Sequence, residues 1–252
     1  MTTESGAPAH HWETSWAPLA VVAGTFFLFP LTFIAYFVYD SLFLTAIFAG
    51  IGTPLLIAGI AKWVNEGLAY KNIVEGAAVP GMSIFIFSEA LVFLALFVGY
   101  WMIHLKADTW PPEGTPAIGS AVPILMTLVL VVSSFTMQRG EAKLEAGDRG
   151  GFVNSLIVTM VLGALFLGLS LYEYNHLLGL GFGTSANAFS SAFYTLTGFH
   201  AAHVLVGLGI FAAMLIPALG GRTNKTFVRC AALYWHFVVV VSFFVVPQVY
   251  FW

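Results

Sequence analysis

Charged side chains are scarce in this sequence. They make up 8% of the 252 residues, whereas hydrophobic residues make up 59% and the mean hydropathy is +0.90. A soluble domain carries about 25% charged residues, so this composition excludes an ordinary soluble protein and indicates an integral membrane protein. The formal net charge is −3 and no basic patch stands out, so the sequence predicts no nucleic-acid partner.

Cysteine is also nearly absent. Cys230 is the single one, which excludes an intrachain disulfide framework. The N-terminal stretch MTTESGAPAHHWETSW lacks a basic segment and a small-residue cleavage site. We therefore expect the first apolar segment to be a retained helix rather than a cleaved signal.

Seven apolar runs are long enough to cross a membrane as helices, because a ~30 Å hydrocarbon core needs roughly 20 residues. The runs also lack the alternation of barrel strands. We therefore predict an all-α, polytopic membrane protein with seven transmembrane helices in a single membrane domain, residues 1–252. Residues 1–15 form a tail, 16–63 hold the first two helices in a tight antiparallel hairpin, and 80–252 hold the other five. The predicted helices, first to seventh, are 16–39, 41–63, 80–105, 119–138, 151–178, 188–219 and 227–251.

Lysine and arginine are distributed unevenly along the chain. If the N-terminus lies inside, eight of them fall on the inner side and only Lys106 falls outside. This positive-inside bias predicts a cytoplasmic N-terminus and a C-terminus on the opposite side. The inner residues are Lys62, Lys71, Arg139, Lys143, Arg149, Arg222, Lys225 and Arg229.

Four polar residues fall at a similar depth inside the predicted helices. At 1.5 Å per residue, Glu89 in the third helix and His236 in the seventh both lie roughly 14 Å from the inner end. His200 and His203 of the sixth helix fall in the same slab, on one face by their i,i+3 spacing. A lone carboxylate at that depth costs several kcal/mol. We therefore expect histidines of the sixth and seventh helices to hold Glu89, which requires those helices to pack on the third.

Three interpretations of this cluster stay open: a buried hydrogen-bond network that fixes helix packing, a proton-handling site or proton antenna, and a metal or haem site. For the last, Glu173 and His176 match a Glu-x-x-His pattern, but a di-iron site needs two such motifs and two further glutamates. These two residues also fall near the outer end of the fifth helix. We therefore predict an outer-end polar pair there and no metal site.

Other seven-helix functions can be compared with the sequence. A retinal protein needs a lysine inside a helix for its Schiff base, and all five lysines here lie in loops or at helix ends. A secondary transporter typically shows inverted repeats and broken helices, and we find neither in this sequence. A small-solute membrane transporter stays as the alternative from another class.

Four motifs carry a resemblance to a known family. They are GMSIFIFSEALVF (81–93), WPPEG (110–114), YTLTGFHAAHVLVG (194–207) and ALYWHFVVVV (232–241). In order and spacing they resemble the successive signatures of subunit III of cytochrome c oxidase, in the haem–copper terminal oxidase family.

The resemblance implies a non-catalytic core subunit of a proton-pumping oxidase of the aerobic respiratory chain, in a bacterial cytoplasmic (inner) membrane. It implies no cofactor of its own, with haems and copper in the partner subunits I and II. It further implies that the first two helices splay from the other five around a cleft that binds phospholipid. Such a subunit supports the stability of subunit I, its proton uptake, and O₂ access through the bound lipid.

The resemblance also assigns residues. The family's Ser-Glu motif maps onto Glu89, its sixth-helix histidines onto His200 and His203, and its Tyr-Trp-His onto 234–236. On the inner side we expect phospholipid headgroups near Lys62, Lys71 and Arg222.

Two positions depart from the family pattern. Val239 stands where the family has an aspartate, and Ser242 where it has a tryptophan. These departures suggest a divergent bacterial branch and keep a nitric oxide reductase accessory subunit as an alternative. The electron donor (cytochrome c or quinol), the haem type of the partner and membership of a larger respiratory supercomplex stay open.

Overall fold

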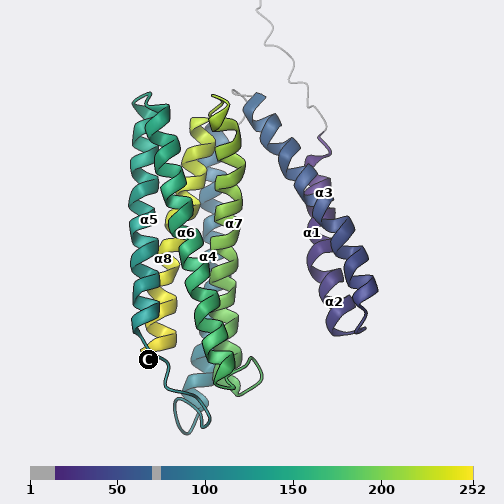
Figure 1. Cartoon of the computed structure of the whole chain (residues 1–252), viewed down its shortest axis with the longest axis vertical. Helices are drawn as coiled ribbons and strands as arrows, with labels where there is room; N and C mark the ends of the chain where they lie inside the picture. Colours follow the sequence, from purple (N-terminus) through teal and green to yellow (C-terminus); the bar gives the residue numbers. More distant parts are fainter. Residues whose placement is uncertain (1–14, 70–74, 252) are drawn as a thin grey trace, which may run out of the picture. The chain divides into compact units, whose positions relative to one another are not determined.

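The computed structural model describes residues 15–69 and 75–251, and all its regular elements in these ranges are helices (Figure 1). Seven helical spans are long and apolar enough to cross a membrane, which confirms the predicted all-α fold. The elements are α1 (Ala17–Phe26), η1 (Phe27–Leu31), α2 (Thr32–Phe37), α3 (Leu42–Ala69), α4 (Glu75–Lys106), α5 (Ala121–Glu145), α6 (Arg149–Gly179), α7 (Ala188–Leu219) and α8 (Lys225–Tyr250). The first three form one span.

Several helices extend beyond the predicted runs. α3 continues past Trp63 to Ala69, and α4 begins at Glu75 instead of residue 80. Apolar composition marks only the part of a helix that crosses the hydrocarbon core, whereas backbone hydrogen bonding continues into the polar interface. The sixth predicted helix, which is α7, has the predicted bounds 188–219.

The chain divides into two compact units, 1–69 and 70–252, each described here by itself. In the first, the span α1–η1–α2 and α3 form the predicted hairpin. Glycines allow the two backbones to approach: a Cβ atom on Gly24 would lie 2.5 Å from the Leu56 amide nitrogen, and one on Gly52 would lie 2.6 Å from that of Leu28. The pairing of 24 with 56 and 28 with 52 confirms the antiparallel arrangement. Asp40, with a φ of 46°, makes the turn.

The second unit is a bundle of α4 to α8, with α8 at its centre. α8 contacts α4, α5 and α7, and 56% of its most apolar segment is buried, against 33% or less for every other span. Trp235 of α8 is fully buried, and its Nε1 donates to the Ser133 hydroxyl at 3.0 Å. Gly163 of α6 and Gly207 of α7 make room for its ring, since a Cβ atom on either would lie within 2.8 Å of it. α8 therefore fixes where α4 to α7 present their polar groups.

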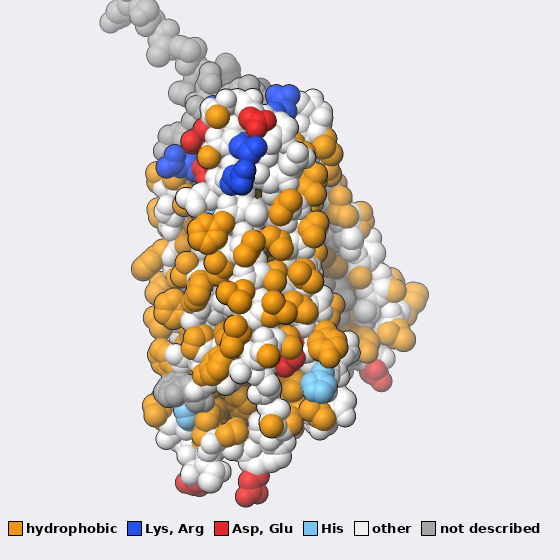
Figure 2. Space-filling view, turned by 60° about the vertical axis from the view of Figure 1, so that its left-hand side comes forward, with side chains coloured by type: hydrophobic (Ala, Val, Ile, Leu, Met, Phe, Trp, Pro, Cys, Tyr) orange, Lys and Arg blue, Asp and Glu red, His pale blue; other side chains and the backbone are white. Residues whose placement is uncertain are grey.

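Lysine and arginine side chains gather at one end of this bundle, where α5 meets α6 and α7 meets α8 (Figure 2). Asp148 caps α6 there: its Oδ1 accepts from the Gly151 amide at 2.8 Å, and its Oδ2 lies 3.1 Å from the Lys143 ammonium. These two contacts, the amide first, lower the pKa of the Asp148 carboxyl below its usual value. The basic end is the one predicted to face the cytoplasm, and that orientation stays a prediction.

Candidate functional site

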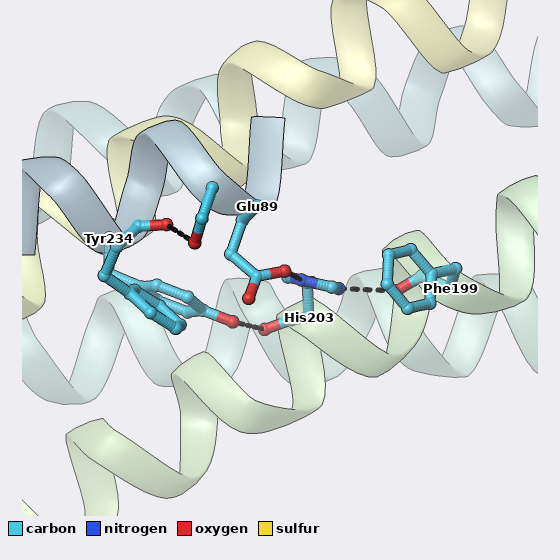
Figure 3. A network of polar contacts seen from close by, with 6 residues as sticks. Glu89, Phe199, His203 and Tyr234 are labelled. Carbon is cyan, nitrogen blue, oxygen red and sulfur yellow. Dashed lines mark hydrogen bonds and ion pairs between the residues drawn. The ribbon is translucent and has the colours of Figure 1, made fainter. Parts of the chain in front are cut away.

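Glu89 of α4 meets His203 of α7 inside the second unit (Figure 3). The His203 Nε2 lies 3.2 Å from the Glu89 Oε2, and its Nδ1 lies 2.8 Å from the Phe199 carbonyl oxygen. The Glu89 side chain is only 21% exposed and the His203 side chain only 12%. The structure thus brings together the predicted carboxylate and one of the three predicted histidines.

The acceptor beside the Nδ1 of His203 indicates the tautomer of this ring. A carbonyl oxygen only accepts, so the Nδ1 of His203 carries a hydrogen and donates to Phe199. Its Nε2 can then contact the Glu89 oxygen in only two ways: as a lone pair accepting from a carboxylic acid, or as an N–H donating to a carboxylate. In both forms one hydrogen lies between the Glu89 Oε2 and the His203 Nε2.

Aromatic rings enclose the His203 imidazole. Its ring centroid lies 4.6 Å from that of Phe199 and 4.9 Å from that of Phe93. Tyr234 of α8 stacks on it at 6.4 Å, with the planes 17° apart, and donates its hydroxyl to the His203 carbonyl at 3.1 Å. This enclosure holds the ring in one orientation and ties three helices, α4, α7 and α8, at one point.

His236 does not hold Glu89, contrary to the prediction for the seventh helix. Its Nδ1 lies 2.6 Å from the Ser134 hydroxyl of α5. Tyr234, two residues earlier and about 200° away around the helix, is the residue of α8 that reaches His203 instead. Depth arithmetic carries no information on the direction in which a side chain points.

His200 likewise lies apart from the pair. Three residues along a helix leave two side chains about 60° apart, and His200 points toward α6, with its ring 5.5 Å from that of Phe166. It is 3% exposed, and neither ring nitrogen has a hydrogen-bond partner among the described residues. It lines a cavity together with Glu173, which is 5% exposed.

The remaining predicted residues lie elsewhere. His176 is exposed, one turn beyond Glu173 on α6. Lys62 of α3 pairs with Glu66 at 2.9 Å and lies 5.3 Å from the Trp16 ring centroid. Arg222 is exposed between α7 and α8, and Lys71 lies outside the described residues. Within ranges 15–69 and 75–251, no three His, Cys, Asp or Glu residues are grouped as metal ligands.

Three contacts of the predicted residues were not foreseen from the sequence. Tyr234 stood in the quoted YWH motif, but its hydroxyl was not assigned a partner. Ser134 carried no signal, because a serine in a transmembrane helix commonly bonds to its own backbone. The Phe199 carbonyl is a backbone group that any residue supplies, so only the fold reveals it.

Comparison with known proteins adds a further finding. A family model described as "Cytochrome c oxidase subunit III" matches residues 14–252. A protein of Synechocystis sp. named "Cytochrome c oxidase subunit 3" is 38% identical over 165 residues, which cover 64% of this chain and 70% of that protein. The protein of the same name from Thermostichus vulcanus is 38% identical over 167 residues, which cover 65% of this chain and 81% of that protein. The protein of that name from Branchiostoma lanceolatum is 30% identical over 272 residues, covering 100% of this chain and 99% of its own.

Proposed function

This chain belongs to the cytochrome c oxidase subunit III family, and from that premise we propose that it serves a respiratory haem–copper oxidase without carrying a redox centre of its own. It is a multi-pass membrane subunit of an oxidoreductase complex. Under this proposal the haems and copper belong to subunits I and II, where O₂ is reduced to water.

One observation supports the proposed role of the site: the chain of hydrogen bonds from Glu89 through His203 ends on a backbone carbonyl. A proton wire needs a group at each step that both takes up and gives away a proton. Here the Nδ1 of His203 donates to the Phe199 backbone carbonyl, which is not a proton carrier, and Tyr234 donates to another backbone carbonyl. Glu89 and His203 therefore serve to lock α4, α7 and α8 together, rather than to pass protons along the subunit.

The subunit then acts on its partner through shape and stability. A rigid bundle of α4 to α8 gives subunit I a fixed surface, which supports its stability and the fast uptake of protons through it. Phospholipid bound near Lys62, Lys71 and Arg222 fills the space beside the first two helices and gives O₂ an apolar route. The complex lies in a bacterial cytoplasmic (inner) membrane, with the basic ends of the helices facing the cytoplasm.

Removing the chain from the complex tests this role. Purified oxidase stripped of this subunit should keep its haem and copper content and its initial rate of O₂ reduction. It should lose activity faster during sustained turnover, and adding the purified subunit back should restore the lifetime. Loss of haem or copper in proportion to the removed chain is the result that contradicts the proposal.

A further inference from the structure

A cavity of about 30 Å³ lies between α5, α6, α7 and α8. Its lining includes neither Glu89 nor His203, so it is distinct from the pair described above. Two of its polar groups, Glu173 and His200, are ionisable and almost fully buried. The polar side chains that line it come from α6, α7 and α8 and are Ser170, Glu173, Tyr174, Thr197, His200, Ser242 and Tyr250.

The His200 imidazole needs two hydrogen-bond partners here. A neutral imidazole has one N–H donor and one lone-pair acceptor, and neither nitrogen has a partner among the described residues. Phe166 and Phe93 pack edge-on against the ring, with centroids at 5.5 and 6.5 Å. The required partner must therefore come from the cavity.

Four of the hydroxyl groups that line the cavity have already donated their hydrogens to other groups. Ser170 donates to the Phe166 carbonyl at 3.0 Å, and Ser242 to the Val239 carbonyl at 2.7 Å. Tyr174 donates to the Thr197 hydroxyl at 2.8 Å, which in turn donates to a backbone carbonyl. These oxygens can still accept a hydrogen bond. The missing ligand must then donate to the imidazole lone pair, accept from its N–H, and donate to a lining oxygen.

Water is the small molecule with this combination of donors and acceptors. One water needs about 10–15 Å³ of cavity, so the cavity has room for about two, and polar partners on three helices meet the usual requirement for a buried water. An acyl chain offers no donor or acceptor, and a metal ion cannot accept from the N–H. We propose that this cavity is an internal water-binding site, in which water connects the His200 imidazole with the Glu173 carboxyl group.

A map of the complex that is purified through a tag on this chain tests the proposal without any substitution. At a resolution that shows ordered water, we expect density within about 3.2 Å of a His200 ring nitrogen, with a hydrogen-bonded path to Glu173. A dry cavity, an acyl chain in it, or a partner subunit's side chain bonded to His200 would overturn the proposal. The test does not depend on which complex the tag retrieves.

A thermal-stability cycle gives a second readout. His200→Phe removes both ring nitrogens, and Glu173→Gln replaces the carboxyl group that water contacts at the other end. If water joins the two groups, the fall in Tm for the double variant is smaller than the sum of the two single falls, since residues in one network are not additive. His176→Phe, at the exposed neighbour of Glu173, is the matched control. Its fall in Tm should add to the fall caused by His200→Phe. Additive losses for His200 and Glu173 would count against a shared water.

Discussion

One proton lies between Glu89 and His203, whichever residue carries it, and this sets what a substitution does. Glu89→Gln places an amide that can donate to the Nε2 lone pair of neutral His203, so the chain should assemble with nearly unchanged Tm. Glu89→Ala leaves that nitrogen without a partner, at a cost of about 1–3 kcal/mol. We expect a lower Tm and less subunit retained in the complex, measured by thermal unfolding and by subunit content.

A neighbouring position supplies the control for that experiment. The Ser88 hydroxyl bonds to the Phe85 carbonyl of its own helix, so Ser88→Ala should leave assembly unchanged. If Gln harms O₂ consumption and proton release as much as Ala does, in a fully assembled complex, then Glu89 handles protons and the structural role is wrong.

At this scale the sequence predicts depth better than direction. The rise of 1.5 Å per residue is a constant of the helix, so Glu89 and His203 were expected at one level and they meet. Which side a residue faces depends on helix rotation, which the packing of Trp235 against Gly163 and Gly207 sets. No pattern in an evenly apolar helix reveals that rotation. His236 and His200 were therefore assigned to Glu89, although they face Ser134 and Phe166.

At the scale of elements, the start of α6 depends on a charged cap. The pKa of Asp148 is lowered in the folded state by the Gly151 amide and the Lys143 ammonium. A lowered folded pKa gives stability that is full above the ordinary value of 3.8 and is lost as the pH falls below it. Asp148→Asn keeps a capping oxygen without the charge. The advantage in Tm of the wild type over this variant should shrink as the pH is lowered, and a constant difference would contradict this account of the cap.

The hairpin of the first unit gives an element-scale test with a matched control. Gly52 and Gly50 lie on the same helix, but only Gly52 faces a neighbouring backbone, with Leu28 N 2.6 Å from an added Cβ. Gly52→Ala should push the two spans apart, at a cost of about 1–3 kcal/mol. Gly50→Ala, with nothing within 4 Å of an added Cβ, should have no such cost. Tm and protease sensitivity of the hairpin measure both, and equal effects would refute the close backbone packing.

At the scale of the whole molecule, bound lipid is expected to cover the unit 1–69. The spans of the first unit leave large apolar side chains such as Phe33, Phe37 and Phe43 more than half exposed, and these need an apolar cover. We expect acyl chains on these side chains, and removal of tightly bound phospholipid should lower the Tm. Variants Lys62→Gln and Arg222→Gln should retain less lipid in native mass spectrometry. An unchanged Tm after the phospholipid is removed would contradict this expectation.

Purification of the complex through a tag on this chain, with haem and copper measured, tests the central claim most directly. The account predicts that a chain with haem and copper accompanies this one in a fixed ratio, that the complex reduces O₂, and that the metals stay with the partner when this chain is removed. Isolation under mild detergent as a chain by itself, or with partners that hold neither haem nor copper, would contradict it.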